Sequence, residues 1–335
     1  SLVMPTDQFR NLVFEGGGIR GIAYAGVLEI LEKKGYLKNI RRMAGTSAGA
    51  ITATLVSLGA GSDDVAEIVG GTSFRKFLDD SFGMIRALDR FLNEYGWYKG
   101  DSFAQWMKKQ IYALGDNADL DFRGLAALVQ KEPKRFRELY LIGSNLSLGL
   151  PQVFSAQETP DVPIWQAVRI SMSIPLFFAS VKRQGEIHVD GGVTWNYPLD
   201  LFDSRTYVSD AAHYTLPDYP TRYHKEHVYN KETLGFRLDT KDEIKAEMQD
   251  WRSPPRKIED ILDYSKALIG FMMDTANKMH LHENDWHRTV FVDTKGVKTT
   301  DFDLSDQKVE ELIQSGREGT TDYLDWFEDP KSAPL

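Results

Sequence analysis

Two glycine-containing motifs near the start of the chain combine the residue types that acyl transfer requires. The first, residues 16–21, reads Gly-Gly-Gly-Ile-Arg-Gly, and a loop of this composition exposes backbone N–H groups that bind an anion. The second, residues 45–49, reads Gly-Thr-Ser-Ala-Gly and matches the G-x-S-x-G turn that presents a serine between a strand and a helix. Ser47 is thus a candidate nucleophile, and the glycine loop is a candidate cradle for the oxyanion that its attack creates.

Other interpretations of these motifs remain open at this point. Gly16, Gly18 and Gly21 also match the dinucleotide fingerprint G-x-G-x-x-G. That fingerprint requires an acidic residue at the end of the second strand, whereas here the second strand ends at Ala44 and the serine turn follows. A purely structural glycine turn is a further alternative, and Ser47 alone could serve as a plain helix N-cap.

A serine hydroxyl needs a base to accept its proton, and Asp190 is the best candidate. It ends an apolar strand and precedes Gly191 and Gly192, which allow a sharp turn and leave the carboxylate open to Ser47. Capping of that turn is the alternative role for Asp190. The seven histidines lie in no distinctive motif. A Ser–Asp–His triad remains a second hypothesis, with one of three histidines as the base: His280, His282 or His287.

The elements around the two motifs predict a parallel α/β arrangement. Residues 11–15 and 40–44 are short apolar runs typical of buried strands. Residues 22–34 and 48–58 have helical spacing and end at Gly35 and Gly59. Parallel sheets bind ligands at the carboxyl ends of their strands, and both motifs are predicted to lie at such ends.

The rest of the chain gives a coarser prediction. Residues 62–115 are predicted to be helical, and their aromatic part, 74–106, either belongs to the core or roofs an acyl pocket and contacts lipid. Residues 203–232 show no period and are predicted to form a long loop. Further expected elements are a strand pair at 139–143 and 152–155, strands at 187–190, 233–238 and 289–293, a helix at 162–172, and one or two helices at 258–282.

Composition excludes several classes of protein. The 335 residues are 42% hydrophobic and 27% charged, as in ordinary globular proteins. The net charge of −9 disfavours binding to nucleic acid, and the absence of cysteine excludes disulfides, thiolate catalysis and zinc–thiolate sites. No apolar run is long enough for a transmembrane helix, and residues 1–8 lack the features of a signal peptide. We therefore expect a cytoplasmic protein or one peripheral at membranes, with secretion by another route left open.

Taken together, the motifs resemble those of patatin-like phospholipases, a family of calcium-independent lipid acyl hydrolases. The resemblance rests on the glycine loop at 16–21, the serine turn at 45–49 and Asp190-Gly191-Gly192, in the family's order. Residues 96–100, 171–175 and 193–198 support it. It covers residues 10–205 well, whereas the last third of the chain departs from the family and indicates nothing about the substrate.

The resemblance implies a three-layer α/β/α patatin-like fold, in which helices flank a central, mainly parallel sheet. Residues 9–205 would form the catalytic core, and residues 206–335 would continue the same domain with a variable loop at 203–232 and helical elements. The expected partner is a lipid or acyl-ester substrate, with possible contact to a membrane surface. No metal or organic cofactor is expected, and the oligomeric state stays open.

The resemblance also implies a catalytic dyad without histidine, in which Ser47 is the nucleophile and Asp190 the base of a phospholipase A-type acyl hydrolase that forms an acyl-enzyme. Partial desolvation would be needed to raise the basicity of a carboxylate whose ordinary pKa is near 4. The N–H groups of Gly17 and Gly18 would form the oxyanion hole, with Ile19 or Arg20 as further donors. The site residues implied are, in the oxyanion loop, Gly16, Gly17, Gly18, Ile19, Arg20 and Gly21, and, in the serine turn, Gly45, Thr46, Ala48 and Gly49.

Overall fold

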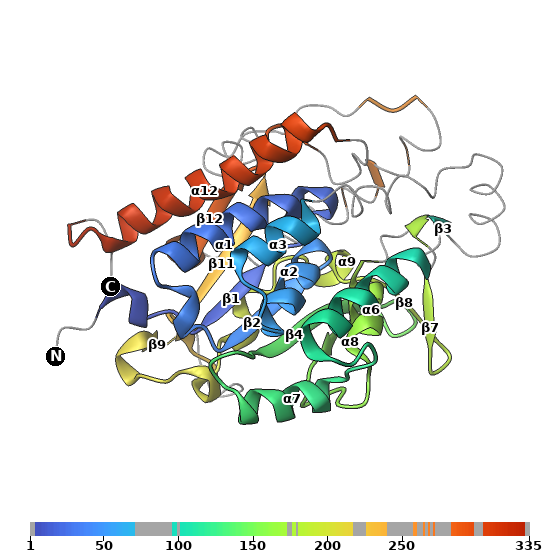
Figure 1. Ribbon diagram of the computed structural model, residues 1–335, viewed down its shortest axis with the longest axis horizontal. Coiled ribbons are helices and arrows are strands. Elements are labelled where there is room, and N and C mark those ends of the chain that lie inside the picture. The colour runs from blue at the N-terminus through green and yellow to red at the C-terminus, as the bar shows by residue number, and fades with distance from the viewer. Residues whose placement is uncertain are drawn as a thin grey trace.

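A central sheet with the strand order β12-β11-β1-β2-β4-β8-β7 organises the chain, and β5 pairs with β4 outside this path (Figure 1). The computed structural model describes residues 4–70, 96–98, 101–172, 176–178, 180–216, 226–239, 257–259, 264, 267–268, 271, 283–297 and 304–331. The strands of the sheet are β1 (Asn11–Phe14), β2 (Arg42–Thr46), β4 (Glu138–Asn145), β5 (Leu150–Phe154), β7 (Val181–Arg183), β8 (Glu186–Asp190), β11 (Thr233–Asp239) and β12 (Thr289–Asp293).

The sheet is mainly parallel, so the predicted α/β class is confirmed. Strands β12, β11, β1, β2 and β4 run in parallel, whereas β5, β8 and β7 join in antiparallel fashion. The predicted strand pair at 139–143 and 152–155 is present as β4 and β5. The strands predicted at 233–238 and 289–293 are β11 and β12, so the last third of the chain contributes two strands to the central sheet.

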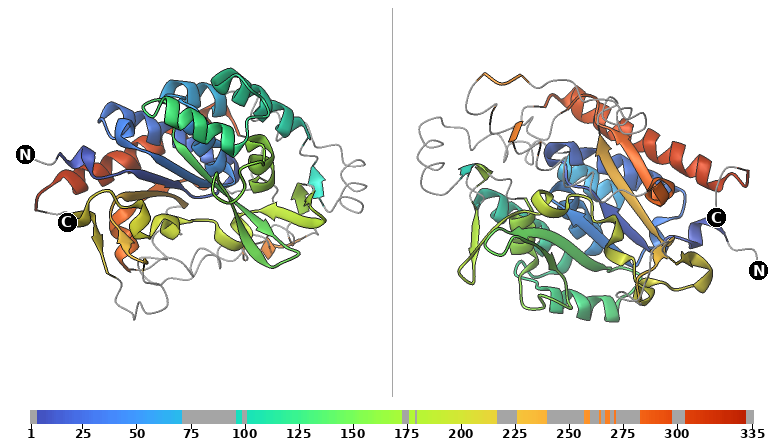
Figure 2. Two further views of the ribbon diagram at one scale, coloured as in Figure 1. Left: turned by 90° about the horizontal axis from the view of Figure 1, so that it is seen from below. Right: turned by 180° about the vertical axis from the view of Figure 1, so that it is seen from behind.

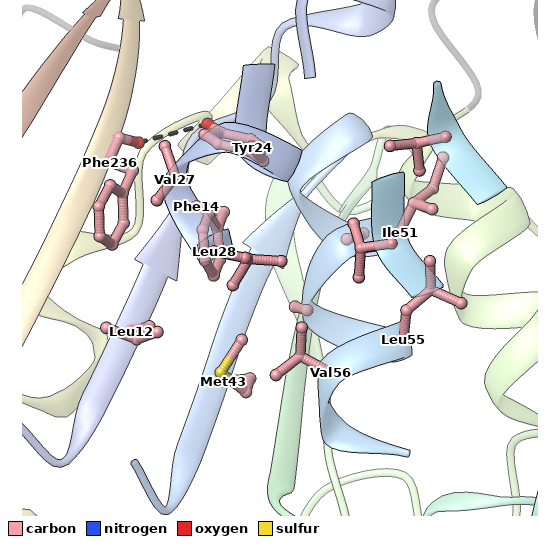
Figure 3. Close-up of a cluster of buried hydrophobic side chains, with 14 of the residues drawn as sticks. Leu12, Phe14, Tyr24, Val27, Leu28, Met43, Ile51, Leu55, Val56 and Phe236 are labelled. Carbon is pink, nitrogen blue, oxygen red and sulfur yellow. Dashed lines mark hydrogen bonds between the residues drawn. The ribbon is translucent and has the colours of Figure 1, made fainter. Parts of the chain in front are cut away.

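Helices cover one face of the sheet (Figure 2, left). Side chains alternate along β1, so that Leu12 and Phe14 face the helices while Val13 faces the other way. Figure 3 shows Leu12, Phe14 and Met43 packed against the apolar faces of the two helices that follow β1 and β2. The helices are α1 (Tyr24–Lys33), α2 (Ala48–Ser57), α3 (Ser62–Val69), α6 (Asp101–Gly115), α7 (Phe122–Lys131), α8 (Ile164–Ser171) and α12 (Asp306–Glu328).

The opposite face of the sheet is covered by short helical segments in the part of the chain that the structure describes. Val13, Ala44 and Tyr140 pack there against Tyr197, which follows α9 (Gly192–Trp195), and against side chains of the turn η4 (Leu199–Phe202). The ring of Phe202 meets the edge of Tyr140 at a centroid distance of 5.0 Å. The chain that follows Asp190 therefore folds directly over this second face.

Helix α12 lies across α1 at very close range, which requires glycine on both helices. A Cβ atom at Gly26 of α1 would meet the carbonyl oxygen of Ile313, and one at Gly316 of α12 would meet the carbonyl oxygen of Ala23. Such close backbone contact fixes the C-terminal helix against the sheet layer. None of the helices described here is both long and apolar enough to cross a bilayer.

The prediction of an all-helical segment at 62–115 is wrong in one place. Helices α3 and α6 lie within it, but β3 (Gly96–Tyr98) is a short strand that pairs in parallel with β6 (Leu176–Phe178). Aromatic residues suit strands as well as helices, so a short aromatic run does not distinguish the two. Residues 71–95, which contain most of the predicted aromatic stripe, lie outside the described residues.

The segment at 203–232 is more ordered than the predicted loop. It contains the turns η5 (Arg205–Tyr207) and η6 (Ala211–His213), and β9 (Tyr214–Thr215) pairs with β10 (Tyr229–Asn230). The buried carboxylate of Glu232 organises it by accepting hydrogen bonds from the backbone N–H groups of Ser209 and Asp210. Polar side chains supply the order here, and they leave no periodic signal in a sequence. Residues 217–225 and most of the helix predicted at 258–282 lie outside the described residues.

Candidate active site

Ser47 stands at a strained turn between β2 and α2, where the sequence predicts a strand–turn–helix junction. Its backbone adopts φ 56° and ψ −122°, a region that favours glycine, so the surrounding contacts must hold it there. A Cβ atom at Gly45 would meet the carbonyl oxygen of Gly49, and one at Gly49 would meet the carbonyl oxygen of Phe14. The two glycines of the motif are therefore needed for the close approach of α2 to β1 and β2.

Two hydrogen bonds hold this turn from outside the motif, and a third fixes Ser171, which is a partner in one of them. The Ser47 N–H donates to Ser171 Oγ at 2.7 Å, and Ser171 Oγ donates in turn to the carbonyl oxygen of Ile142 at 2.6 Å. Thr46 Oγ1 donates to the carbonyl oxygen of Trp195 at 3.1 Å. Helix α8, strand β4 and helix α9 thus all contribute to the position of Ser47.

Asp190 lies at the same height along the strands as the end of β2, although it comes from an antiparallel strand. On β4, Ile142 pairs with Thr46 and the next residue, Gly143, pairs with Asp190. The Asp190 side chain is fully buried, and its Oδ1 accepts the N–H of Gly192 at 2.7 Å. The capping role considered for this carboxylate is therefore present, and it occupies only one of the two carboxylate oxygens.

The Ser47 hydroxyl borders both Asp190 and Met172. Burial raises the pKa of Asp190 to about 7, and the hydrogen bond from the Gly192 N–H and the neighbouring Ser47 hydroxyl limit this rise. The hydroxyl donates to Met172 Sδ at 3.6 Å, while Asp190 Oδ2 has no hydrogen bond of good geometry to any other described residue. The increase in basicity expected from partial desolvation is thus present at Asp190.

The amides of the glycine loop differ in their availability. The Gly16 N–H donates to the carbonyl oxygen of Asn196 at 3.1 Å, and the Arg20 N–H donates to the carbonyl oxygen of Gly17 at 3.2 Å. Both amides are therefore already bonded, and the Arg20 amide is one of the two further donors considered for the oxyanion hole. The N–H groups of Gly17, Gly18 and Ile19 make no backbone hydrogen bond to the described residues. Gly18 has φ +57°, a left-handed turn that makes successive N–H groups converge.

The glycine loop lies directly against the serine turn. A Cβ atom at Gly16 would lie 3.0 Å from Ser47 Cβ, and one at Gly21 would lie 2.5 Å from Ala48 Cβ. Asn196 fixes the start of the loop, because its Nδ2 also donates to the carbonyl oxygen of Gly16 at 3.1 Å. The structure therefore brings the two motifs and Asp190 together.

Charged residues fix the start of the glycine loop, where Glu15 precedes Gly16. Glu15 Oε1 accepts the N–H of Leu238 at 3.0 Å, and Glu15 Oε2 lies 3.3 Å from Arg237 Nε. Burial and the nearby Asp239 raise the pKa of Glu15, against the opposing influence of Arg237 and Arg20. Arg20 Nε donates to the carbonyl oxygen of Gly17 at 3.2 Å, so the Arg20 side chain links the two halves of the loop.

The histidines that the triad hypothesis requires are not brought to this site in the described part of the chain. His287 lies before the first residue of β12, at the opposite edge of the sheet, and its ring stacks on Trp326 at a centroid distance of 5.8 Å. His280 and His282 lie outside the described residues. The described residues also contain no group of three or more His, Asp or Glu side chains positioned to hold a metal ion.

The sequence model of the patatin-like phospholipase family matches residues 12–203, a span that contains both motifs and Asp190. The chain belongs to this family. The match covers most of β1 and the chain through the turn η4, so β11, β12 and α12 lie beyond it although they complete the same sheet and helix layer.

Relatives of this patatin-like chain match it over a similar part of its length. The uncharacterized protein YqhO of Bacillus subtilis is 34% identical over 200 residues, which cover 57% of this chain and 65% of YqhO. The probable lipid hydrolase 463L of Invertebrate iridescent virus 6 is 23% identical, covering 60% of this chain and 66% of that protein. Lysophospholipase nte1 of Aspergillus fumigatus is 30% identical over a match that covers 57% of this chain and 11% of that protein. The match thus spans less than two thirds of each relative.

Solved structures share the fold of this patatin-like chain. VipD from Legionella pneumophila superposes with a TM-score of 0.57 at 19% identity, covering 95% of this chain and 67% of VipD. The ExoU–SpcU complex of Pseudomonas aeruginosa gives a TM-score of 0.52 at 20% identity, covering 98% of this chain and 52% of that one. At this level of identity the likeness concerns the fold alone.

Sequence reasoning missed three residues that support this patatin-like site. Ser171 binds the Ser47 N–H, Met172 accepts the Ser47 hydroxyl, and Asn196 binds Gly16. All three lie in segments that had only supported the family resemblance, at 171–175 and 193–198. Their place in these two segments was the available signal, but their contacts depend on the pairing of β4 with β2 and β8.

Proposed function

We propose that this chain is a serine lipid acyl hydrolase of phospholipase A type that uses Ser47 as nucleophile and Asp190 as base. The observation that carries the proposal is the pairing of a strained serine with a buried carboxylate whose pKa is raised to about 7 and is sensitive to the Ser47 hydroxyl. Membership of the patatin-like phospholipase family supports the choice of a lipid ester as substrate.

In the proposed cycle, Asp190 accepts the Ser47 proton while Ser47 Oγ bonds to the carbonyl carbon of the ester. The carbonyl oxygen becomes an oxyanion, which the N–H groups of Gly17 and Gly18 stabilise, with Ile19 as a third donor. The tetrahedral intermediate collapses with loss of the alcohol, which takes the proton from Asp190, and an acyl-enzyme remains. Water then gives a proton to Asp190 and attacks the acyl carbon, and Ser47 regains its proton when the fatty acid leaves.

Burial makes Asp190 suitable for this role. A carboxylate of ordinary pKa near 4 is a poor base for a hydroxyl, whereas one with a pKa of about 7 is a better proton acceptor and is still largely ionised slightly above neutral pH. The hydroxyl donates to Met172 Sδ in this structure, so the proposed transfer requires it to turn toward Asp190, whose pKa already responds to it. Loss of one oxyanion donor would cost about 3 kcal/mol of transition-state stabilisation.

The test is an assay of the wild type, Ser47→Ala and Asp190→Asn against phospholipids, galactolipids, neutral glycerides and short-chain esters. We expect the wild type to hydrolyse at least one class and both variants to lose about 1,000-fold or more in kcat. Ser57→Ala is the matched control, because Ser57 is a buried serine at the other end of α2 whose hydroxyl has no partner among the described residues.

Covalent labelling distinguishes this proposal from its rivals. A fluorophosphonate should modify the wild type at Ser47 and leave Ser47→Ala unlabelled. A binding protein that merely retains the fold would not react at Ser47 under any condition, and that result would overturn the proposal. The dinucleotide alternative instead requires saturable binding of a nicotinamide or flavin dinucleotide, which we expect to be absent in titration.

A further inference from the structure

Two hairpins extend beyond Ser47 at the same edge of the sheet. Strand β4 continues from Gly143, which pairs with Asp190, to a turn at residues 146–149 before β5 begins. This turn begins three residues past Gly143, or about 10 Å further along the strand direction. The β7–β8 hairpin turns at Gln184 and Gly185 beside it (Figure 2).

The first hairpin carries an unusual set of exposed apolar side chains, and we call residues 146–150 the leucine tip. Leu146, Leu148 and Leu150 are 49%, 59% and 55% exposed. A single exposed leucine on a protein surface needs no explanation, but three within five residues form a patch of the kind that contacts a partner or a membrane.

The leucine tip is held in a fixed shape by side-chain hydrogen bonds. Asn145 Oδ1 accepts the Leu148 N–H at 3.0 Å, and Asn145 Nδ2 donates to Glu186 Oε2 at 2.6 Å. Ser147 Oγ accepts the Ile187 N–H at 2.9 Å, which joins the tip to the neighbouring hairpin. Because the tip is already ordered, docking loses less conformational entropy than a flexible loop would.

Positive charge lies next to the leucine tip on the second hairpin. Lys182 is exposed and sits opposite Ile187, and Arg183 follows it. Neither cation forms an ion pair with a described residue. On a protein with a net charge of −9, two neighbouring cations that have no ion-pair partner among the described residues favour the approach of this end of the molecule to an anionic surface.

We propose that the leucine tip and the adjacent Lys182–Arg183 pair form a docking surface for an anionic lipid bilayer. The leucines enter the interfacial layer and the two cations meet lipid phosphates. A bilayer bound in this way faces the edge of the sheet where Ser47 and Asp190 lie. The inference rests on the proposed function only for its choice of lipid as the partner.

The test is flotation of the full chain with vesicles of phosphatidylcholine mixed with phosphatidylglycerol, and with vesicles of phosphatidylcholine alone. The Ser47→Ala protein is the reference, and every other variant also carries this substitution, so the lipids stay intact whether or not the chain hydrolyses esters. We expect the reference to bind the anionic vesicles more tightly than the neutral ones. Leu148→Ser should weaken binding to both about tenfold, because one apolar side chain no longer enters the interface.

Leu216→Ser is the matched control, since Leu216 is 61% exposed and follows β9 at the opposite end of the sheet (Figure 1). We expect it to bind as the reference does. Lys182→Gln should weaken binding to the anionic vesicles alone, whereas the exposed Lys134, which precedes β4 at the far edge, should tolerate the same change. Melting temperatures check that each variant is folded.

Three results would overturn the docking surface. The reference could bind neither kind of vesicle, Leu148→Ser could bind as well as Leu216→Ser, or Leu148→Ser could alter the mass of the protein in light scattering without lipid, which would make the tip a contact between two copies of the chain. Because binding is measured without hydrolysis, an inactive wild type that floats with anionic vesicles would contradict the proposed function and leave the docking surface intact.

Discussion

Ser47 and Asp190 meet at one level of the sheet although they come from strands that run in opposite directions. Ser47 follows the end of β2, and Asp190 ends β8, which runs antiparallel to the intervening β4. The burial that results raises the pKa of Asp190 to about 7, while the Ser47 hydroxyl holds it down. Several measurable consequences follow from this one contact.

The first consequence is a pH dependence of activity. If Asp190 must be ionised to accept the Ser47 proton, kcat/KM should rise with pH through about 7. We expect activity at pH 6 to be about tenfold below that at pH 8, since roughly a tenth of the carboxylate is ionised one unit below its pKa. A base with an ordinary aspartate pKa would give constant activity from pH 6 to 8, and such a flat profile would contradict the assignment.

The second consequence concerns stability. The folded-state pKa of Asp190 is raised from 3.8 to about 7, so the folded protein favours the protonated form. The contribution of the protonated Asp190 carboxyl to the free energy of unfolding is fully present below pH 4 and is lost as the pH rises through 7. Asp190→Asn should therefore be more stable than the wild type at pH 8, by up to about 4 kcal/mol at roughly 1.4 kcal/mol per pKa unit.

Urea unfolding of Asp190→Asn and the wild type at pH 4 and pH 8 measures this difference. The gap in the free energy of unfolding should shrink toward zero at pH 4, where the wild-type carboxyl is protonated in the folded state and about half protonated in the unfolded state. An equal gap at both pH values would show that the substitution acts through packing. Asp322→Asn is a suitable control, because Asp322 lies exposed on α12.

Ser171 should act as a positioning residue for the nucleophile. Ser171→Ala removes the acceptor of the Ser47 N–H and leaves a buried donor unpaired, which costs about 1–3 kcal/mol in the free energy of unfolding. Because the Ser47 backbone is strained, the rate of fluorophosphonate labelling should also fall, by about tenfold. The control Ser57→Ala should change neither quantity, and a purely structural role for Ser171 would lower stability without slowing labelling.

Much of the fold was predictable because its signals are local. The runs at 11–15 and 40–44 and the helical spacing at 22–34 and 48–58 each specify one element, and the glycines at their ends specify the connections. The strand at 96–98 was not predictable in this way, since its pairing with β6 depends on a distant segment. The small strands β9 and β10 likewise depend on contacts around Glu232.

The candidate site was predictable as a set of residue types but not in its details. The motifs identified Ser47, Asp190 and the loop, since glycines mark places where backbone must approach closely. Which loop amides are free could not be predicted, because the Gly16 N–H is taken by Asn196, whose position depends on the turn after Asp190. The antiparallel direction of β8 was equally hidden, since a short apolar strand does not reveal its direction.

Close packing between the glycine loop and the serine turn predicts the effect of Gly21→Ala. A Cβ atom there would lie 2.5 Å from Ala48 Cβ, so the loop must move away from the turn. We expect a loss of at least about 100-fold in kcat with little change in KM, because the oxyanion donors are displaced. Gly115→Ala is the control, since a Cβ atom at Gly115 would lie an ordinary 3.5 Å from Leu120. Activity retained by Gly21→Ala would argue against an oxyanion role for this loop.

Met172 competes with Asp190 for the Ser47 hydroxyl, and its removal should shift the pH profile. The hydroxyl donates to Met172 Sδ, whereas Asp190 Oδ2 has no hydrogen bond of good geometry among the described residues. Met172→Leu conserves the volume of this buried side chain but deletes the acceptor, so the hydroxyl should turn to Asp190. A hydrogen bond to the charged carboxylate lowers its pKa, and the rise of kcat/KM should therefore move to lower pH.

A pH–rate profile measures this shift, and Met107→Leu, at a buried methionine of α6, is the matched control that should leave the profile unchanged. An unshifted profile in Met172→Leu would mean that the sulfur contact does not hold the hydroxyl away from the base.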